Sequence, residues 1–432
     1  MARSRVIAGI DIGTAKTCTV IAAVSDEDKI NVIGVASAES HGLRKSQIVD
    51  IEDAIEAITE SVEAAERMAG YSINSAFVSI GGMHIASQNS KGVVAVSEPE
   101  GEINTGDVAR VIEAARAISL PSAREILHVI PRDFIVDSQE GIKDPIGMTG
   151  VRLEAEAHLI TGATTAMRNL TKCVGEIGIN VQGLVFSGLA SAEAVLSETE
   201  RELGVILIDL GGGSTSIAIF VEGSLAHSAV IPIGARNITN DLAIGMRVSL
   251  DSAEKIKLNL SSEKPEPVSP DTETTNTNQK TVDEIDLTQL GIKEEINSAS
   301  RKTLVDGIIR PRLNEIFTMV GMELKKSGFG GQTPAGVVLT GGGALTVDIL
   351  TACKRTLAMP VRLGIPKGLS GLVDEIRNPS YAAATGLILY GYKNEGATKV
   401  RSSGGALGKM MDKIPVKGAV NKAIDFVKSF LP

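Results

Sequence analysis

Two aspartates in this sequence each stand just before a glycine turn, at the end of an apolar run. Asp11 lies in VIAGIDIGTAKT and Asp209 lies in VILIDLGGGSTS. Glycine lets a backbone approach an anion closely, and the successive N–H groups of such a turn form a concave cradle for phosphate. A carboxylate beside that cradle could hold Mg²⁺ through its water shell. The sequence therefore predicts a phosphate site at each turn, with Asp11 and Asp209 facing the metal.

The phosphate contacts that we predict are the glycines, whose backbone can come close, and their neighbours with hydroxyl or backbone donors. They are Gly13, Thr14, Ala15 and Lys16 in the first turn and Gly211, Gly212, Gly213, Ser214 and Thr215 in the second. A single glycine-rich turn is commonly no more than a tight hairpin. Two copies with the same placement of the aspartate make that interpretation unfavourable here.

The elements that must position these turns have the pattern of β-hairpins. Residues 6–24 give an apolar run, a turn around Gly13 and a second apolar run, with a third strand expected in INVIGVAS. VILIDLGGGSTSIAIFVEG repeats this order, and its third strand is expected near HSAVIPIG. Self-similarity of this kind predicts two related domains that face each other.

A third glycine cluster, VVLTGGGALTVDIL, differs from the first two. We expect a buried strand that ends at Thr340 and a helix that begins near Leu345. The backbone of the glycines between them could lie against a flat nucleobase or a ribose, and these glycines are Gly341, Gly342 and Gly343. The first two turns lead into strands, so the sequence does not carry a dinucleotide-binding fingerprint, which requires the turn to open a helix.

Glu254 and Lys257 stand three residues apart in DSAEKIKLNL and so share one face of a predicted helix. Two interpretations stay open for this pair. It is either an ordinary surface ion pair or part of a nucleotide pocket, where it would hydrogen-bond the ribose hydroxyls beside the base.

Together these motifs resemble the actin-like ATPase superfamily. DIGTAKT resembles its first phosphate motif, IDLGGGSTSIAIF its second and VVLTGGGALT its adenosine motif. The resemblance implies an α/β fold of duplicated RNase H-like domains, with ATP and Mg²⁺ in the cleft between them. It also implies that Glu254 and Lys257, which match the family's AExxK pattern, contact adenosine. Relatives often have Asn where this chain has Lys16, so Lys16 is assigned a backbone contact alone.

The stretch 75–161 predicts a small helix-on-sheet insert. In GDVARVIEAARAI the apolar residues recur at helical spacing as far as Ile118, and the segments on either side alternate as strands do. GGMHIASQNSKG, LHVIPRDFIVD and DPIGMTGVRLE stand in the order of the 1C subdomain in the FtsA family of bacterial cell division proteins. The chain resembles that family over nearly its whole length.

The resemblance implies a division of the chain into two domains, each with a subdomain, and a tail. Domain 1A and its insert 1C are assigned as 1–74 plus 162–200 plus 361–393, and 75–161. Domain 2A and its subdomain 2B are assigned as 201–240 plus 300–360, and 241–299. Within 2B, residues 261–281 are polar, contain proline and lack any large hydrophobe, so we expect a disordered loop there. A linker over 394–413 and an amphipathic helix over 414–432 complete the chain.

The last residues, KGAVNKAIDFVKSFLP, have an apolar face flanked by lysines when they are placed on a helix. Such a helix could simply pack on the body of the protein. A linker that detaches it would leave its apolar side chains in water, which favours the interface of an anionic bilayer, where each lysine adds about 1 kcal/mol. The residues that we predict to enter the lipid are Val420, Ile424, Phe426, Val427, Phe430 and Leu431.

The resemblance carries a function with it. In the FtsA family this terminal helix attaches FtsZ filaments to the cytoplasmic membrane at the division septum. The implied partners are FtsZ, further copies of the chain in a filament, anionic membrane lipid and other divisome proteins. Turnover of ATP is implied to be weak or absent, and no catalytic residue is assigned. The alternatives are a PilM-like protein of type IV pilus assembly and a phosphotransferase of the sugar-kinase type.

Bulk composition excludes other classes. The chain has 432 residues, enough for two or more domains. A net charge of -9 and 3% aromatic residues oppose a nucleic-acid surface, which needs clustered cations or stacking rings. The three cysteines have no CxxC spacing, so neither a disulfide framework nor a zinc site is expected. No signal peptide and no run of ~20 apolar residues is found, so we expect a cytoplasmic protein whose membrane contact is peripheral.

Overall fold

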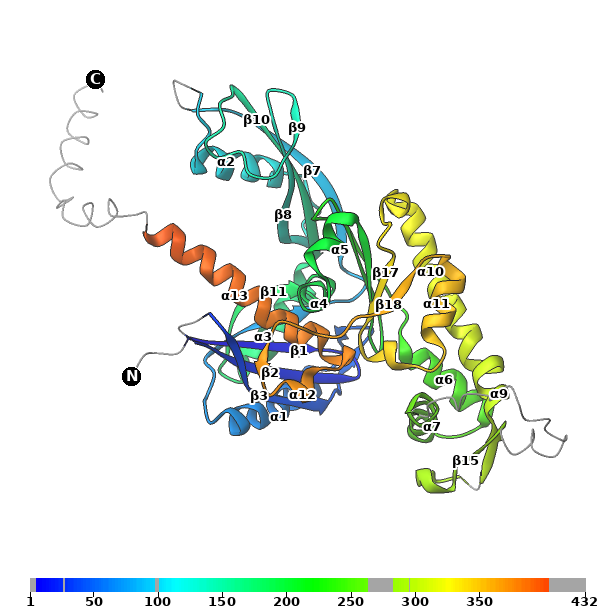
Figure 1. Cartoon of the computed structure of the whole chain (residues 1–432). Coiled ribbons are helices and arrows are strands. Elements are labelled where there is room, and N and C mark those ends of the chain that lie inside the picture. Colours follow the sequence, from blue (N-terminus) through cyan, green and yellow to red (C-terminus); the bar gives the residue numbers. More distant parts are fainter. Residues whose placement is uncertain (1–4, 26–27, 98–100, 263–282, 295, 404–432) are drawn as a thin grey trace, which may run out of the picture. The chain divides into compact units, whose positions relative to one another are not determined.

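The computed structural model describes residues 5–25, 28–97, 101–262, 283–294 and 296–403. The chain separates into two compact units, residues 1–389 and 390–432. The sheets of the described residues all belong to the first unit, and several of their strands are labelled in Figure 1.

The first large sheet carries the first glycine turn. Its six strands follow the order β11-β6-β1-β2-β3-β19. Their bounds are β1 Arg5–Ile12, β2 Lys16–Val24, β3 Ile30–Glu39, β6 Ser75–Ile80, β11 Asn180–Phe186 and β19 Ser370–Gly371. The first three strands form an antiparallel meander, and β6 runs parallel to β1 on its other side. Helices α1 (Ile51–Ala69) and α3 (Thr164–Glu176) share one buried apolar cluster with this sheet.

The second large sheet repeats this arrangement around the second glycine turn. Its five strands follow the order β14-β13-β12-β17-β18. Their bounds are β12 Val205–Leu210, β13 Thr215–Val221, β14 Ser224–Ile231, β17 Val337–Thr340 and β18 Val361–Leu363. Strands β12 to β14 form an antiparallel meander, and β17 runs parallel to β12 as β6 does to β1. Both predicted hairpins, their third strands and the duplication of the fold are therefore confirmed.

Helices and short elements complete the first unit. The α-helices, besides α1, α3 and the insert's α2, are α4 Ser187–Val195, α5 Glu198–Leu203, α6 Ala235–Met246, α7 Leu250–Ser262, α9 Arg301–Leu304, α10 Arg310–Ser327, α11 Ile349–Leu357, α12 Val373–Ile376 and α13 Ala382–Ser403, which continues into the second unit. The short elements are the strands β4 Leu43–Arg44, β5 Gln47–Ile48, β15 Glu284–Asp286 and β16 Ser298–Ser300, the 3-10 turns η1 Thr288–Leu290, η3 Gly330–Gln332, η4 Gly342–Leu345 and η5 Pro379–Tyr381, and the π-helical η2 Val305–Ile309.

The insert is a four-stranded antiparallel sheet in the order β7-β10-β8-β9, with helix α2 packed against it. The bounds are β7 Ala86–Ala95, α2 Thr105–Arg116, β8 Arg124–Val136, β9 Gln139–Ile142 and β10 Arg152–Ala163. A Cβ added at Gly92 would clash with the carbonyl oxygen of Val111, so the helix rests directly on β7. The helix-on-sheet prediction holds, but the helix ends at Arg116, which leaves Ile118 outside it.

The insert meets the second large sheet at the edge strand β14. Ser87 Oγ donates to the carbonyl oxygen of Ser228 at 2.7 Å, and the Ser228 N–H donates back to Ser87 Oγ at 3.2 Å. Asn89 Nδ2 donates to the carbonyl oxygen of Ala226 at 3.3 Å. Two edge strands are thus joined by side chains rather than by a backbone ladder.

Three predicted boundaries differ from the structure. Residues 75–80 form β6 and pair with β1, so the insert begins after this strand and not at Ser75. Residues 361–363 form β18 and pair with β17, so they lie in the second sheet and not in domain 1A. The helix expected near Leu345 begins at Ile349, because the glycine-rich residues before it form the tighter turn η4.

The predicted tail lies mostly outside the described residues. Helix α13 runs to Ser403, so the first part of the predicted linker, 394–403, is helical. This part contains no proline, and the glycine pair of the linker follows the last helical residue. The predicted helix 414–432, with its lipid-facing residues, lies outside the described residues, as does nearly all of the predicted loop 261–281. In the part of the chain that is described, no helix is long and apolar enough to cross a bilayer.

Candidate nucleotide site

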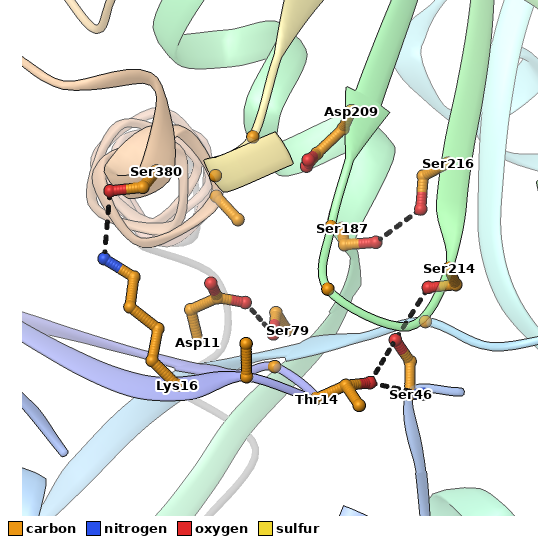
Figure 2. Close-up of a pocket in the computed structure, with 18 of the residues that line it drawn as sticks. Asp11, Thr14, Lys16, Ser46, Ser79, Ser187, Asp209, Ser214, Ser216 and Ser380 are labelled. Atoms are coloured by element: carbon orange, nitrogen blue, oxygen red, sulfur yellow. Dashed lines mark hydrogen bonds between the residues drawn. The ribbon is translucent and has the colours of Figure 1, made fainter. Parts of the chain in front are cut away.

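A cavity of about 210 Å³ lies where the two glycine turns meet, and the third glycine cluster borders it. The turns come from the β1–β2 and β12–β13 hairpins, which belong to different sheets (Figure 2). The predicted site residues that line this cavity are Asp11, Gly13, Thr14, Ala15, Lys16, Asp209, Gly211, Gly212, Ser214, Gly341 and Gly342. Residues that are far apart in the sequence are thus brought to one place.

Asp11 and Asp209 occupy equivalent positions and make equivalent contacts. Asp11 Oδ1 accepts a hydrogen bond from Ser79 Oγ at 2.6 Å, and Asp209 Oδ2 accepts one from Ser191 Oγ at 2.5 Å. Burial, together with the charge of Asp11, raises the pKa of Asp209 to about 7, although the hydrogen bond from Ser191 acts against the rise. Burial also raises the pKa of Asp11, but the hydrogen bond from Ser79 and the charge of Lys16 act against the rise.

These two carboxylates fit a magnesium ion. A hard cation prefers oxygen ligands, and Mg²⁺ commonly keeps several waters while one or two carboxylates hold it. Two acids with raised pKa values mark a place where a positive charge would be stabilising. Over the described residues no group of three or more His, Cys, Asp and Glu side chains gathers in a metal-binding arrangement, so substrate oxygens and water would supply the remaining ligands.

Lys16 lines the cavity, and its ammonium group is held by the chain's C-terminal part. Its Nζ donates to Ser380 Oγ at 3.1 Å and lies 3.5 Å from the centre of the Tyr381 ring. Both partners belong to η5, directly before α13. Burial lowers the pKa of Lys16, while the negative charge of Asp11 opposes that change. Lys16 therefore offers the cavity a cation as well as the backbone contact expected from the sequence.

The two turns touch each other across the cavity. A Cβ added at Gly212 would lie 2.8 Å from Ala15 Cβ, and one added at Gly213 would lie 2.7 Å from Thr14 Oγ1. Arg236, on α6, joins the walls as well. Its Nη1 donates to the carbonyl oxygen of Thr14 at 3.4 Å, and its backbone N–H donates to that of Gly212 at 2.8 Å.

Five of the predicted contacts do not line the cavity: Gly213, Thr215, Glu254, Lys257 and Gly343. The expectation that the Thr215 hydroxyl points to phosphate is wrong, because its fully buried Oγ1 donates to the carbonyl oxygen of Ile233 at 2.7 Å. Gly343 packs on Leu210, where a Cβ would lie 2.5 Å from Leu210 Cγ.

Glu254 and Lys257 pair with each other as part of a small network, in which Lys257 is buried and the Glu254 side chain is 42% exposed. Lys257 Nζ donates to Glu254 Oε2 at 2.7 Å and to Thr239 Oγ1 at 2.9 Å. The Thr239 hydroxyl itself donates to Glu254 Oε2 at 2.5 Å. The network ties α7 to α6, and the contact of these two side chains with a ribose stays a prediction.

Sequence reasoning missed a set of serines around the cavity, which are Ser46, Ser79, Ser187, Ser216 and Ser380. Single serines carry no motif, so the sequence offered little signal for them. Ser79 has the clearest sequence signal of the five, because it lies near the end of a buried strand, two residues before a pair of glycines.

Family comparisons give a consistent match. A family model described as "SHS2 domain inserted in FTSA" matches residues 82–161, and one described as "Cell division protein FtsA" matches residues 206–386. Cell division protein FtsA of Pseudomonas aeruginosa is 38% identical over 95% of both chains. FtsA of Borreliella burgdorferi is 41% identical over 91% of this chain and 93% of its own, and FtsA of Bacillus subtilis is 38% identical over 91% and 85%.

Solved structures share the fold at much lower identity. The PilM–PilN type IV pilus biogenesis complex matches with a TM-score of 0.62 and 15% identity, over 89% of this chain and 98% of the other. MreB5 of Spiroplasma citri bound to ADP matches with a TM-score of 0.51 and 13% identity, over 91% and 98%. At these identities the likeness concerns the fold alone.

Proposed function

Because this chain belongs to the FtsA family of bacterial cell division proteins, we propose that it binds ATP with Mg²⁺, assembles into filaments and tethers FtsZ filaments to the cytoplasmic membrane at the septum. The observation that carries the nucleotide part is the convergence of Asp11, Asp209 and both glycine turns on one cavity. MreB5 of Spiroplasma citri, which has a similar fold, has been solved with ADP and with AMPPNP.

The residues of the cavity divide the work of holding a triphosphate. Backbone N–H groups of the glycine turns and the hydroxyls of Thr14 and Ser214 would donate to phosphate oxygens from opposite walls. Lys16 would supply the one cationic side chain among the residues that line the cavity. Asp11 and Asp209 would hold Mg²⁺, which neutralises phosphate charge. Gly341 and Gly342 at the cavity border would leave room for the nucleoside.

We assign no base for ATP hydrolysis. The two acids in the cavity are already bound to serine hydroxyls and are the metal candidates. Turnover would accordingly be weak or absent, and the nucleotide would act chiefly on conformation and assembly. The other divisome partners would then recognise a surface that depends on the bound nucleotide.

The membrane part rests on the sequence of the tail. One short amphipathic helix binds lipid modestly, but an array of tails on a filament binds by avidity. Electron microscopy of the full-length chain with ATP on anionic lipid monolayers tests the whole proposal, because it requires lipid-attached protofilaments. Protein that stays in solution under these conditions would contradict the adaptor function.

A pair of adjacent substitutions isolates the role of the tail. Phe430→Glu places a charge on the face predicted to enter lipid, and Ser429→Glu places the same charge on the polar face. Burial of one Phe contributes about 1.5–3 kcal/mol, so Phe430→Glu should lower sedimentation with anionic vesicles at least about tenfold. Ser429→Glu should cost no more than the ~1 kcal/mol of one charge. Equal losses in both variants would mean that the apolar face is not inserted.

A further inference from the structure

The turn between β4 and β5 has no recognisable sequence motif, yet it lies where the two glycine turns of the cavity meet. Its two central residues, Lys45 and Ser46, have φ values of 51° and 58°, and Arg44 pairs with Gln47 across the turn. Two left-handed residues in succession are typical of a type I′ hairpin turn, where Asn and Gly are favoured. Lys and Ser in these positions carry backbone strain, and strain of this kind gathers at functional sites.

Ser46 links three elements through hydroxyl groups (Figure 2). Its backbone N–H donates to Thr14 Oγ1 at 2.8 Å. Its own Oγ lies 2.7 Å from Ser214 Oγ and 3.4 Å from Thr14 Oγ1. Thr14 belongs to the first phosphate turn and Ser214 to the second, so the Ser46 side chain stands between opposite walls of the cavity.

The glycine pair that follows β6 leaves room for the β4–β5 turn. Gly81 and Gly82 follow β6, and a Cβ added at Gly82 would lie 3.0 Å from the carbonyl oxygen of Ser46. Gly82 has a φ of 100°, which favours glycine. A side chain at position 82 would push the β4–β5 turn away from Thr14 and Ser214, so the close approach of Ser46 depends on this glycine.

These hydrogen bonds determine where the hydroxyl protons of Thr14, Ser46 and Ser214 can point. Thr14 Oγ1 accepts from the backbone N–H of Ser46, so its own proton can donate either to Ser46 Oγ, 3.4 Å away, or into the cavity. The hydroxyls of Ser46 and Ser214 share one hydrogen bond, so one of their two protons is also left over. Lys16, whose ammonium group is bound to Ser380, is directed to a different part of the cavity.

We propose that Ser46 is a positioning residue for the terminal phosphate of the nucleotide, orienting the hydroxyls of Thr14 and Ser214 so that both donate to that group. The proposal rests on the nucleotide site proposed above and deepens it. A diphosphate lacks the group that these donors address, so Ser46 gives the site a preference for ATP over ADP. A purely structural role would weaken both nucleotides alike.

The test compares ATP and ADP affinities of full-length variants in Mg²⁺, by isothermal titration calorimetry. Ser46→Ala removes the hydroxyl and keeps the strained turn, whereas Ser46→Gly removes the hydroxyl and relieves the strain. Ser138→Ala is the matched control, because Asp137 and Ser138 form a second turn with two positive φ values, between β8 and β9 of the insert and outside the cavity lining. Gly suits the turn, so the second variant folds even where Ala does not.

We expect both Ser46 variants to bind ATP about tenfold more weakly, with ADP affinity changed by less than about twofold and Ser138→Ala unchanged. In a Ser214→Ala background, Ser46→Ala should have a smaller effect than in the wild type, because only the longer contact of its hydroxyl with Thr14 is then left to lose. An unchanged ratio of ATP to ADP affinity would overturn the role of Ser46 and leave the nucleotide site intact. A wild-type chain that binds neither nucleotide would overturn both proposals.

Discussion

The two glycine turns share one architecture but differ in charge. Each follows a central strand whose last residue but one is an aspartate, and each aspartate accepts a hydrogen bond from a serine of a neighbouring element. On the first wall, the charge of Lys16 opposes the rise in the pKa of Asp11 that burial causes. On the second wall, the groups that shift the pKa of Asp209 include no cation that would oppose the rise. Duplication of the fold thus positions the two acids alike, while their protonation depends on the side chains that differ between the copies.

The largest expected effect comes from closing the gap between the walls. Gly212→Val adds a branched side chain where even a Cβ would lie 2.8 Å from Ala15 Cβ. We expect nucleotide affinity to fall by more than about a hundredfold, which corresponds to roughly 3 kcal/mol. Fluorescent-nucleotide titration measures the loss, and thermal unfolding confirms that the variant is folded. Gly175→Val is the steric control, because its Cβ would meet nothing within 4 Å. A folded Gly212→Val that still binds ATP would refute the assignment of the pocket.

The difference between the two acids predicts a pH dependence of stability. The pKa of Asp209 is about 7 in the folded chain against an ordinary value of 3.8, so from pH 4 to 7 the folded state keeps a proton that the unfolded state has lost. The free energy of unfolding therefore falls as pH rises through this window and levels off above it. Asp209→Asn does not titrate, so without metal it should be more stable than the wild type at pH 8, and this difference should shrink as the pH falls towards 4.

Asp11→Asn sharpens the same comparison. Each acid has a serine hydrogen bond that lowers its pKa, but only Asp11 has a cation, Lys16, that also opposes the rise, so the stability gain of Asp11→Asn should be smaller. Urea unfolding in chelator at pH 5 and pH 8 measures both variants. If both variants gain the same free energy of unfolding, or if the gain of Asp209→Asn does not grow with pH, the two acids do not differ in pKa as we propose.

Neighbouring hydroxyls of the second turn should have opposite roles. Thr215→Val leaves the buried carbonyl of Ile233 without its donor, so it should lower the free energy of unfolding by about 1.5 kcal/mol while nucleotide affinity stays unchanged. Ser214→Ala, at the cavity, should weaken nucleotide binding with little change in stability. Chemical unfolding and nucleotide titration on both variants separate the two. Loss of affinity in Thr215→Val would restore the original prediction for this residue.

The smallest expected effect concerns the cation of the first wall. Lys16 lies over the Tyr381 ring, and such contacts contribute about 0.5–1 kcal/mol. Tyr381→Leu and Tyr381→Phe both lose the hydroxyl that bonds Ser37, so the difference between them should be this amount and should vanish in a Lys16→Met background. Tyr381→Phe keeps the ring and is the matched control. A double-mutant cycle that gives no coupling would remove Lys16 as a link between the cavity and the start of α13.

Features that depend on local pattern could be predicted from the sequence. Both hairpins follow from alternating apolar runs around a glycine turn, and the shared aspartate identified the duplication. The Thr215 prediction failed because strand side chains alternate between faces. Ser214 and Ser216 line the cavity, whereas Thr215 between them faces the core.

Features that depend on distant segments could not be predicted in this way. Ser46 and Ser79 reach the cavity from separate elements, and no spacing in the sequence records that meeting. The boundary at Ser75 was placed too early for a similar reason. Membership of β6 in the first sheet depends on its pairing with β1, which the segment itself does not encode.

The side-chain hydrogen bonds between β7 and β14 limit the pairing of further strands with the second sheet. An open edge strand exposes N–H and C=O groups that recruit strands from other molecules. Ser87 and Asn89 occupy those groups on β14 without adding a strand of their own. These backbone groups of Ala226 and Ser228 are therefore not free to pair with a strand of another copy, which disfavours edge-to-edge extension of the second sheet at this place.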